Sequence, residues 1–263
     1  MNKKYITIGI SITLIILMFM SFLFAPNDPQ EADLMNRFQS SSDKYLLGTD
    51  HLGRCVLSRL LYGGKTTLGI ILFGGLIIFL VGTLLGMILS RSIIGTHSIV
   101  DGVINAVTSI PPIAYLIVFI GAWGNGIRTM ILAMTVSYSL RYMKLVKTKT
   151  DLELKKAYVL CARSLGASKF RILFVHVIPN IVNDMIEFIS LSSADMILTI
   201  TGFSFIGLNL GDNVVDWGTM ILEARNYGLV NSKLIIYPIF AVLISSLTFN
   251  IMGSSIGGLN SND

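Results

Sequence analysis

Six long apolar runs constrain this chain more than any other feature of its sequence. An α-helix rises about 1.5 Å per residue, so about 20 mainly apolar residues cross the roughly 30 Å hydrocarbon core of a bilayer. The runs that meet this length are Tyr5–Ala25, Thr67–Ser90, Val103–Trp123, Ile127–Val146, Met185–Leu208 and Leu234–Gly257. They predict an all-α membrane protein with six transmembrane helices.

Composition agrees with a chain that lies mostly in lipid. Only 13% of the 263 residues are charged and 53% are hydrophobic, whereas about a quarter of the residues of a soluble domain are charged. The net charge of +5 does not indicate a nucleic-acid partner, because the basic residues gather in a few loops and no basic patch is interleaved with aromatic residues. We therefore expect membrane lipid, and no nucleic acid, around this chain.

The first run has two interpretations. Lys3 and Lys4 precede it, as in a secretory signal peptide, but the apolar core of a signal peptide has about 7–15 residues and leads to a small-x-small cleavage site. This run is longer, and Phe24-Ala25-Pro26 is a poor cleavage site. We expect an uncleaved helix, with a cleaved signal peptide as the alternative.

The two cysteines are expected to have no special chemistry. Cys55 and Cys161 lie on opposite predicted sides of the membrane, and neither has metal-ligand spacing around it. We therefore predict no disulfide and no metal site, and we expect both side chains to fill space in the packing.

Basic residues set the expected orientation, because Lys and Arg are in excess in cytoplasmic loops. Six spans place both termini on the same side of the membrane. The densest basic group lies around the loop between the fourth and fifth runs: Arg141, Lys144, Lys147, Lys149, Lys155, Lys156, Arg163, Lys169 and Arg171. Both termini and the loop from Lys147 to Ile181 are therefore predicted to be cytoplasmic, with Arg91 on the same side.

This basic loop has the pattern of a short helix. Asp151 and Glu153 are placed where a helix N-terminus favours negative charge, and Gly166 is a natural stop. Residues between them follow helical i, i+3, i+4 spacing, namely Ala157, Leu160, Cys161, Ser164 and Leu165. A second amphipathic stretch, Lys169–Val177, is expected to end at Pro179. Such a helix can lie on anionic lipid or dock in a groove of a soluble partner, and its spacing leaves both possibilities open.

The same segment resembles the "EAA" loop of binding-protein-dependent ABC transporter permeases. It reads AYVLCARSLGASKFRILFVHVIPN, and the matching positions are Leu160, Cys161, Ala162, Gly166 and Ile178-Pro179-Asn180. Leu160 stands where the family has glutamate, and Cys161 where it has the first alanine.

Further matches follow in the family's order. The segment from Leu47 to Leu68 is similar to the LGTD-x-x-GRD-x-x-SR-x-x-YG stretch of the second, C-type permease of dipeptide, oligopeptide and nickel importers, with Cys55 in place of aspartate. FSFIGLN, which ends at Asn209, resembles LSFLGLG, and Trp217-Gly218-Thr219-Met220 resembles WG-x-M. Pro111-Pro112 matches a proline pair in the third span.

The resemblance implies a type I ABC importer permease fold with a cytoplasmic coupling helix, in the bacterial plasma membrane. It divides the chain into residues 1–66 (first helix and extracytoplasmic loop), 67–259 (permease domain) and 260–263 (short tail). The implied partners are a second permease in a heterodimer, two cytoplasmic ATP-binding subunits and an extracytoplasmic substrate-binding protein. The implied cargo is a peptide, nickel or a metal-chelate complex, and the subunit itself is non-catalytic, without cofactor. The implied ATPase-coupling residues are Ala157, Leu160, Cys161, Ala162, Leu165, Gly166 and Pro179.

Three residues inside the predicted spans are candidates for a translocation path. Pro111 and Pro112 remove two backbone donors and should kink the third helix, which either serves packing or lines the path. Asp195 is costly in lipid and should face protein or water, so it either contacts substrate or forms a hydrogen bond in the packing. The glycines at 74, 75, 82 and 86 are expected to allow close helix packing.

Two other classes of protein fit the sequence less well. A secondary transporter driven by an ion gradient needs titratable residues in several spans, and Asp195 is the one that qualifies. An intramembrane serine protease would use Ser204, but His51, His97 and His176 all lie in predicted loops. The chain contains no G-x-x-x-x-G-K-[ST] loop, so ATP hydrolysis is expected in a separate subunit.

Overall fold

The computed structural model describes residues 2–90, 98–208, 210–211 and 213–260. Arg91, His97, Asn209 and residues 261–263 of the predicted tail lie outside the described residues. The helices are α1 (Asn2–Met20), α2 (Val56–Ile88), α4 (Ser98–Ser109), α5 (Pro112–Trp123), α6 (Ile127–Glu153), α7 (Ala157–Ser164), α8 (Lys169–Arg171), α9 (Ile178–Phe205), α10 (Trp217–Ala224) and α11 (Lys233–Asn260). Short 3₁₀ turns cover Ser21–Phe24, Leu34–Asn36 and Arg225–Tyr227, and a π-helical turn covers Ile172–Val177. The described residues form no strand, so the predicted all-α class is confirmed.

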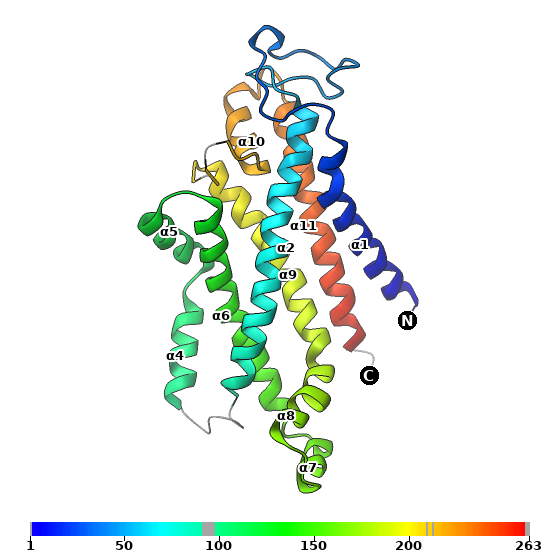
Figure 1. Cartoon of the computed structure of the whole chain (residues 1–263), viewed down its shortest axis with the longest axis vertical. Helices are drawn as coiled ribbons and strands as arrows, with labels where there is room; N and C mark the ends of the chain where they lie inside the picture. Colours follow the sequence, from blue (N-terminus) through cyan, green and yellow to red (C-terminus); the bar gives the residue numbers. More distant parts are fainter. Residues whose placement is uncertain (1, 91–97, 209, 212, 261–263) are drawn as a thin grey trace.

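The long helices form an elongated bundle (Figure 1). α2, α6, α9 and α11 run along its length, α1 lies against α11 on one side, and α4 and α5 lie on the other. α7 projects from one end of the bundle, whereas α10 and residues 26–55 cover the opposite end. We call these the α7 end and the α10 end.

Glycine allows α2 and α6 to approach closely near the C-terminal end of α2. A Cβ atom at Gly82 would lie 2.5 Å from the ring of Tyr142, and one at Gly86 would lie 2.7 Å from Cβ of Val146. The predicted close packing is confirmed at these two positions, whereas Cβ atoms at positions 74 and 75 would make ordinary contacts of 3.5 and 3.9 Å.

Within the described part of the chain, four helical segments are long and apolar enough to cross a membrane: Lys3–Phe24, Val56–Ile88, Lys169–Phe205 and Lys233–Leu259. The third predicted run is not one helix, because α4 and α5 meet at an angle of 78°, and this bent pair makes a fifth span if it is counted as one. α6 is 27 residues long and contains the fourth run, but Arg128, Arg141 and Lys144 interrupt its apolar character. The chain is therefore a multi-pass, all-helical membrane protein.

Two local predictions about the basic loop are wrong. Asp151 and Glu153 belong to the last turn of α6 rather than the first turn of a new helix, because α6 continues past Val146 and these acids are paired there with lysines. Pro179 does not end a helix but lies in the first turn of α9, within a helical segment that runs from Lys169 to Phe205. The π-helical turn just before it shifts the hydrogen-bond register, which lets a residue without an N–H donor continue the helix.

Candidate functional site

A groove at the break between α4 and α5 brings the three candidate path residues together. Its volume is about 560 Å³. Pro111 and Pro112 lie at the break, Tyr138 and Arg141 come from α6, and α9 contributes the longest wall, with Asp195, Leu198, Thr199, Gly202, Phe203 and Ile206.

The proline pair opens this groove by ending one helix and starting another. Pro111 is extended (φ −61°, ψ 144°), and Pro112 occupies the first turn of α5, where its missing N–H and fixed φ are tolerated. The hydroxyl of Tyr115 donates to the carbonyl of Val107 over 3.0 Å, which ties the two helices across the break. The predicted kink is confirmed, and the bend of 78° is large enough to turn α5 away from the line of α4.

α9 presents one continuous face to the groove. Asp195, Thr199, Gly202 and Ile206 are spaced by four, three and four residues, which places them on the same side of a helix. The Thr199 hydroxyl donates to the Asp195 carbonyl over 2.7 Å. This bond occupies the hydroxyl within the helix and leaves the Asp195 carboxylate free to point away from the backbone.

Two charges face the groove without a counter-charge. The Asp195 side chain is exposed and that of Arg141 is half-buried, and neither has an ion-pair partner within 4.0 Å among the described residues. Arg141 lies ~21 Å along α6 from Ile127, and Asp195 lies ~15 Å along α9 from Phe205, at about 1.5 Å per residue. Both therefore lie well away from these helix ends, and a charge at the centre of a bilayer costs about 2.5–3.5 kcal/mol.

The sequence interpretation missed Arg141 as a site residue. From the sequence, Arg141 is assigned only a role in setting the membrane orientation, although it lies inside the fourth apolar run, Ile127–Val146. The rule that singled out Asp195, an ionisable residue within a predicted span, applies equally to Arg141. Its position could therefore have been found from the sequence.

The predicted coupling residues form a second site, at the α7 end. α7 covers Ala157–Ser164, and Gly166 follows with φ +83°. The amide of Gly166 donates to the carbonyl of Arg163, and that of Ala167 donates to the carbonyl of Ala162, both over 3.0 Å. These two bonds make a Schellman motif, which requires a left-handed residue and so favours glycine. The predicted stop at Gly166 is confirmed.

α7 is held to the bundle by one side and leaves the other open. On the inner side of α7, Val159 is fully buried, and the Tyr158 hydroxyl donates to the Glu153 carboxylate over 2.5 Å. Burial, followed by the hydrogen bond to Glu153, raises the pKa of Tyr158 to about 12. The hydroxyl therefore stays protonated, as a donor, at ordinary pH.

The open side of α7 carries several of the predicted coupling residues. Ala157, Leu160, Cys161 and Leu165 are exposed, Leu165 to 89%, while Ala162 is half-buried. Pro179 is exposed on α9. It is adjacent to Asn180, whose amide donates to Tyr158 over 3.2 Å. The prediction that Cys161 fills space is wrong within this chain, because it belongs to the uncovered face. Cys55 is buried at 2%, as expected, and both thiols are free.

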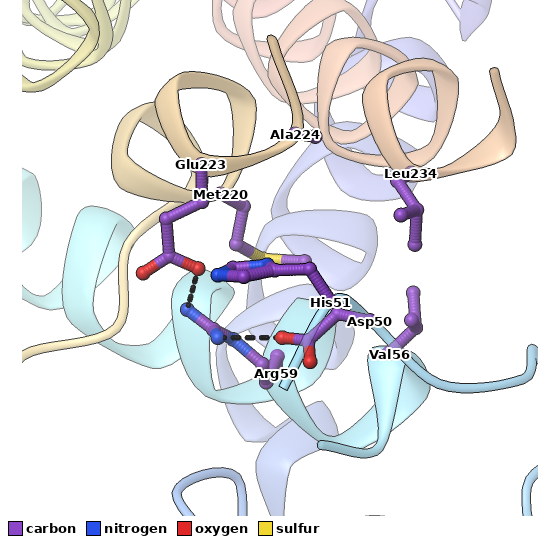
Figure 2. A pocket seen from close by; sticks show the side chains of 8 residues that line it. All are labelled: Asp50, His51, Val56, Arg59, Met220, Glu223, Ala224 and Leu234. Carbon is purple, nitrogen blue, oxygen red and sulfur yellow. Dashed lines mark hydrogen bonds and ion pairs between the residues drawn. The ribbon is translucent and has the colours of Figure 1, made fainter. Parts of the chain in front are cut away.

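A third cluster lies at the α10 end (Figure 2). Asp50, His51 and Glu223 place possible metal-ligand atoms within 4.8 Å of one another. Arg59 bridges the carboxylates, at 2.8 Å from Asp50 and 2.9 Å from Glu223, and Arg54 contacts the same two acids. Two guanidinium groups thus neutralise both carboxylates, so this donor set does not suit a cation.

This cluster is better described as a structural tie. Its pocket holds only about 20 Å³, enough for one water. Arg59 is 3% exposed, and burial raises the pKa of the Glu223 carboxyl while Arg54 opposes that shift. The cluster joins the start of α2 to α10. Glu223, the acid on α10, was not predicted from the sequence because it lies 169 residues from Arg54.

Comparison with known proteins identifies one protein family. The model of the family described as "Binding-protein-dependent transport system inner membrane component" matches residues 80–261. Among the curated proteins, the chain is 26% identical to the glutathione transport system permease protein GsiD of Pectobacterium atrosepticum, over 97% of this chain and 86% of that protein. It is 28% identical to the nickel transport system permease protein NikC of Escherichia coli K12, over 88% and 83% of the two chains.

Two further comparisons agree with these. The chain is 29% identical to the di/tripeptide transport system permease protein DppC of Pseudomonas aeruginosa UCBPP-PA14, over 88% of this chain and 78% of that one. A solved structure of the MetNI methionine ABC transporter in inward-facing conformations aligns with a TM-score of 0.59 at 19% identity, covering 74% of this chain and 93% of the solved one. At that identity, the likeness shows a shared fold.

Proposed function

This chain belongs to the family of binding-protein-dependent transport system inner membrane components and is a permease subunit of an ATP-driven importer; we propose that its cargo passes along the groove at the α4–α5 break. The observation that carries this proposal is the meeting of Pro111, Pro112, Asp195 and Arg141 around one open cavity. Ionisable residues at membrane depth are expected to mark a substrate path. We propose peptides, nickel or a metal-chelate complex as cargo, by analogy with the relatives.

The proposed topology has six spans. The bent pair α4–α5 serves as the third span and α6 as the fourth, and α10 with residues 26–55 lies on the extracytoplasmic side. The basic residues around α7 support this orientation, since they would face the cytoplasm together with both termini. Residues 1–66 then include the first turns of α2 outside the hydrocarbon, residues 67–259 form the permease domain, and residues 260–263 form the tail.

The proposed coupling element is α7. Its uncovered apolar residues, Leu160, Cys161 and Leu165, would dock in a groove of a cytoplasmic ATP-binding subunit, while Tyr158 holds the helix to the bundle. The full assembly would contain a second permease in a heterodimer, two ATP-binding subunits and an extracytoplasmic substrate-binding protein. ATP hydrolysis would belong to the ATP-binding subunits, so this chain is non-catalytic.

Cys161 supplies the experiment that tests this arrangement. The two cysteines of the chain differ sharply, because Cys161 is exposed and Cys55 is 2% exposed. A membrane-impermeant maleimide should label Cys161 in inside-out vesicles stripped of peripheral subunits, and much less in right-side-out vesicles. Adding back the ATP-binding subunits should protect it.

The controls separate orientation from docking. A Cys161→Ser variant should lose the label, and Cys55 should label only after denaturation. Labelling of Cys161 from the outside would overturn the orientation. Equal labelling with and without bound ATP-binding subunits would overturn α7 docking.

A further inference from the structure

Asp195 and Arg141 form a pair of opposite charges in one groove that do not neutralise each other. Among the described residues that line the groove, these two are the ones that carry charge. They come from different helices, α9 and α6, and no ion pair within 4.0 Å joins them. Tyr138 on α6 also lines the groove.

The other residues that line the groove do not neutralise these two charges. The remainder of the described lining consists of proline, aliphatic, aromatic, glycine and threonine residues. The Thr199 hydroxyl donates to the backbone carbonyl of Asp195 on its own helix, so it does not donate to the Asp195 carboxylate. A groove with one positive and one negative side chain, neither of them in an ion pair among the described residues, is complementary to a molecule that carries both charges itself.

We propose, on the basis of the function above, that Asp195 and Arg141 are specificity-determining residues that select a dipolar cargo. The Asp195 carboxylate accepts hydrogen bonds from a cationic ammonium group, and the Arg141 guanidinium donates to a carboxylate of the same molecule. A short peptide with free termini has this chemistry. Each interaction replaces water that the cargo loses on entering the groove.

The dimensions agree with a cargo of this size. An extended chain spans at most about 3.3–3.6 Å per residue, so the termini of a dipeptide stand ~7 Å apart. The cavity of about 560 Å³ falls in the range that encloses small ligands.

The same groove disfavours a bare divalent cation. Arg141 repels a cation that Asp195 attracts, and the described lining contains no histidine or cysteine, the ligands that suit nickel. His51 lies in the cluster at the α10 end, and His176 lies in the π-helical turn. A metal would therefore have to travel as a complex that carries its own negative groups.

The test uses the assembled importer in proteoliposomes and four probes. These are dialanine, N-acetyl-dialanine without the amine charge, dialanine amide without the carboxylate charge, and nickel chloride. The variants are Asp195→Asn and Arg141→Gln. Matched controls make the same chemical changes elsewhere on the same helices, Glu187→Gln on α9 and Arg128→Gln on α6, because neither residue lines the groove. Every comparison uses one substrate-binding protein, so its own selectivity cancels when a variant is compared with wild type on the same pair of probes.

Wild type and both controls should import dialanine about tenfold faster than either blocked peptide, as expected for loss of a hydrogen bond to a charged group. Asp195→Asn should bring dialanine and N-acetyl-dialanine close to equal rates while keeping the preference over the amide. Arg141→Gln should do the reverse.

The outcomes separate this inference from the proposed function. Absence of ATP-dependent uptake of every probe by wild type would remove the proposed function itself. ATP-dependent uptake of dialanine with unchanged selectivity in both variants would overturn only the charge pair. Loss of both preferences together in either variant, or faster import of nickel than of dialanine by wild type, would overturn it as well.

Discussion

Gly166 is the position at which the coupling proposal can be tested most directly. Its φ is +83°, and a Cβ atom there would have no neighbour within 4 Å. A substitution therefore meets no steric clash with the rest of the chain, and its cost is confined to the backbone conformation. This separates the effect of the helix ending from effects of packing.

The magnitude follows from the left-handed conformation. An L-residue with a bulky side chain costs roughly 1–2 kcal/mol there, whereas asparagine visits this region routinely. Gly166→Val should therefore destabilise the Schellman motif at the end of α7 by about 1–2 kcal/mol. This shifts the equilibrium between the formed and the frayed helix end by a factor of about 5–30. Gly166→Asn keeps a side chain at the same place with little strain, so it is the matched control.

The assay compares ATP-dependent uptake and co-purification of the ATP-binding subunits at equal membrane abundance. Gly166→Val should insert normally but reduce uptake about five- to thirtyfold, with weaker co-purification, while Gly166→Asn stays within about twofold of wild type. Uptake by Gly166→Val at the wild-type rate would refute the reasoning. An equal loss in both variants would also refute it, because strain would then not be the cause.

Three further changes have expected outcomes. Arg59→Met should destabilise the chain by about 3–5 kcal/mol, because it leaves the buried Asp50 and the half-buried Glu223 short of one guanidinium. Thermal unfolding in detergent measures this, and exposed Arg37→Met should have little effect. Gly86→Val should lower the free energy of unfolding by about 1–3 kcal/mol, because the new Cβ would lie 2.7 Å from Val146 and 2.8 Å from the Met143 carbonyl. Gly75→Ala should be tolerated, and an equal loss of stability in both variants would contradict this account. The pKa of the Tyr158 hydroxyl is raised to about 12 in the folded state, so the folded state holds the hydroxyl proton more tightly than the unfolded state does. The stability that comes from its hydrogen bond to Glu153 is therefore present at neutral pH and is lost as pH rises towards about 12. Hydrogen exchange of α7 should report this loss in wild type, and Tyr158→Phe should show no such pH dependence.

The parts of the fold that the sequence predicted well are those in which one residue type has one physical use. Gly166 ends α7 because a left-handed residue is needed there, and Pro111-Pro112 breaks the third run because neither residue donates a backbone hydrogen bond. Gly86 marks close packing for a similar reason, since only a hydrogen atom fits against Val146.

The errors concern residues whose meaning depends on where a helix already runs. Asp151 and Glu153 resemble the start of a helix, but α6 arrives there from the other direction and lysines offset the unfavourable dipole at its end. Pro179 resembles a stop, yet the π-helical turn ahead of it accommodates the ring. Neither arrangement can be read from local spacing, because each depends on hydrogen bonds made by the preceding turn.

The groove and α7 are connected through the same two helices. α6 carries Arg141 and ends at Glu153, which accepts the hydrogen bond from Tyr158, and α9 carries Asp195 and begins beside Asn180, which also bonds Tyr158. Arg141 lies ~18 Å from Glu153 and Asp195 ~22 Å from Asn180 along continuous helix, at about 1.5 Å per residue. We therefore expect a displacement of α7 to act on both walls of the groove at once, through α6 and α9. This connection is why strain at Gly166, far from the cavity, is expected to appear as lost uptake rather than as failed membrane insertion.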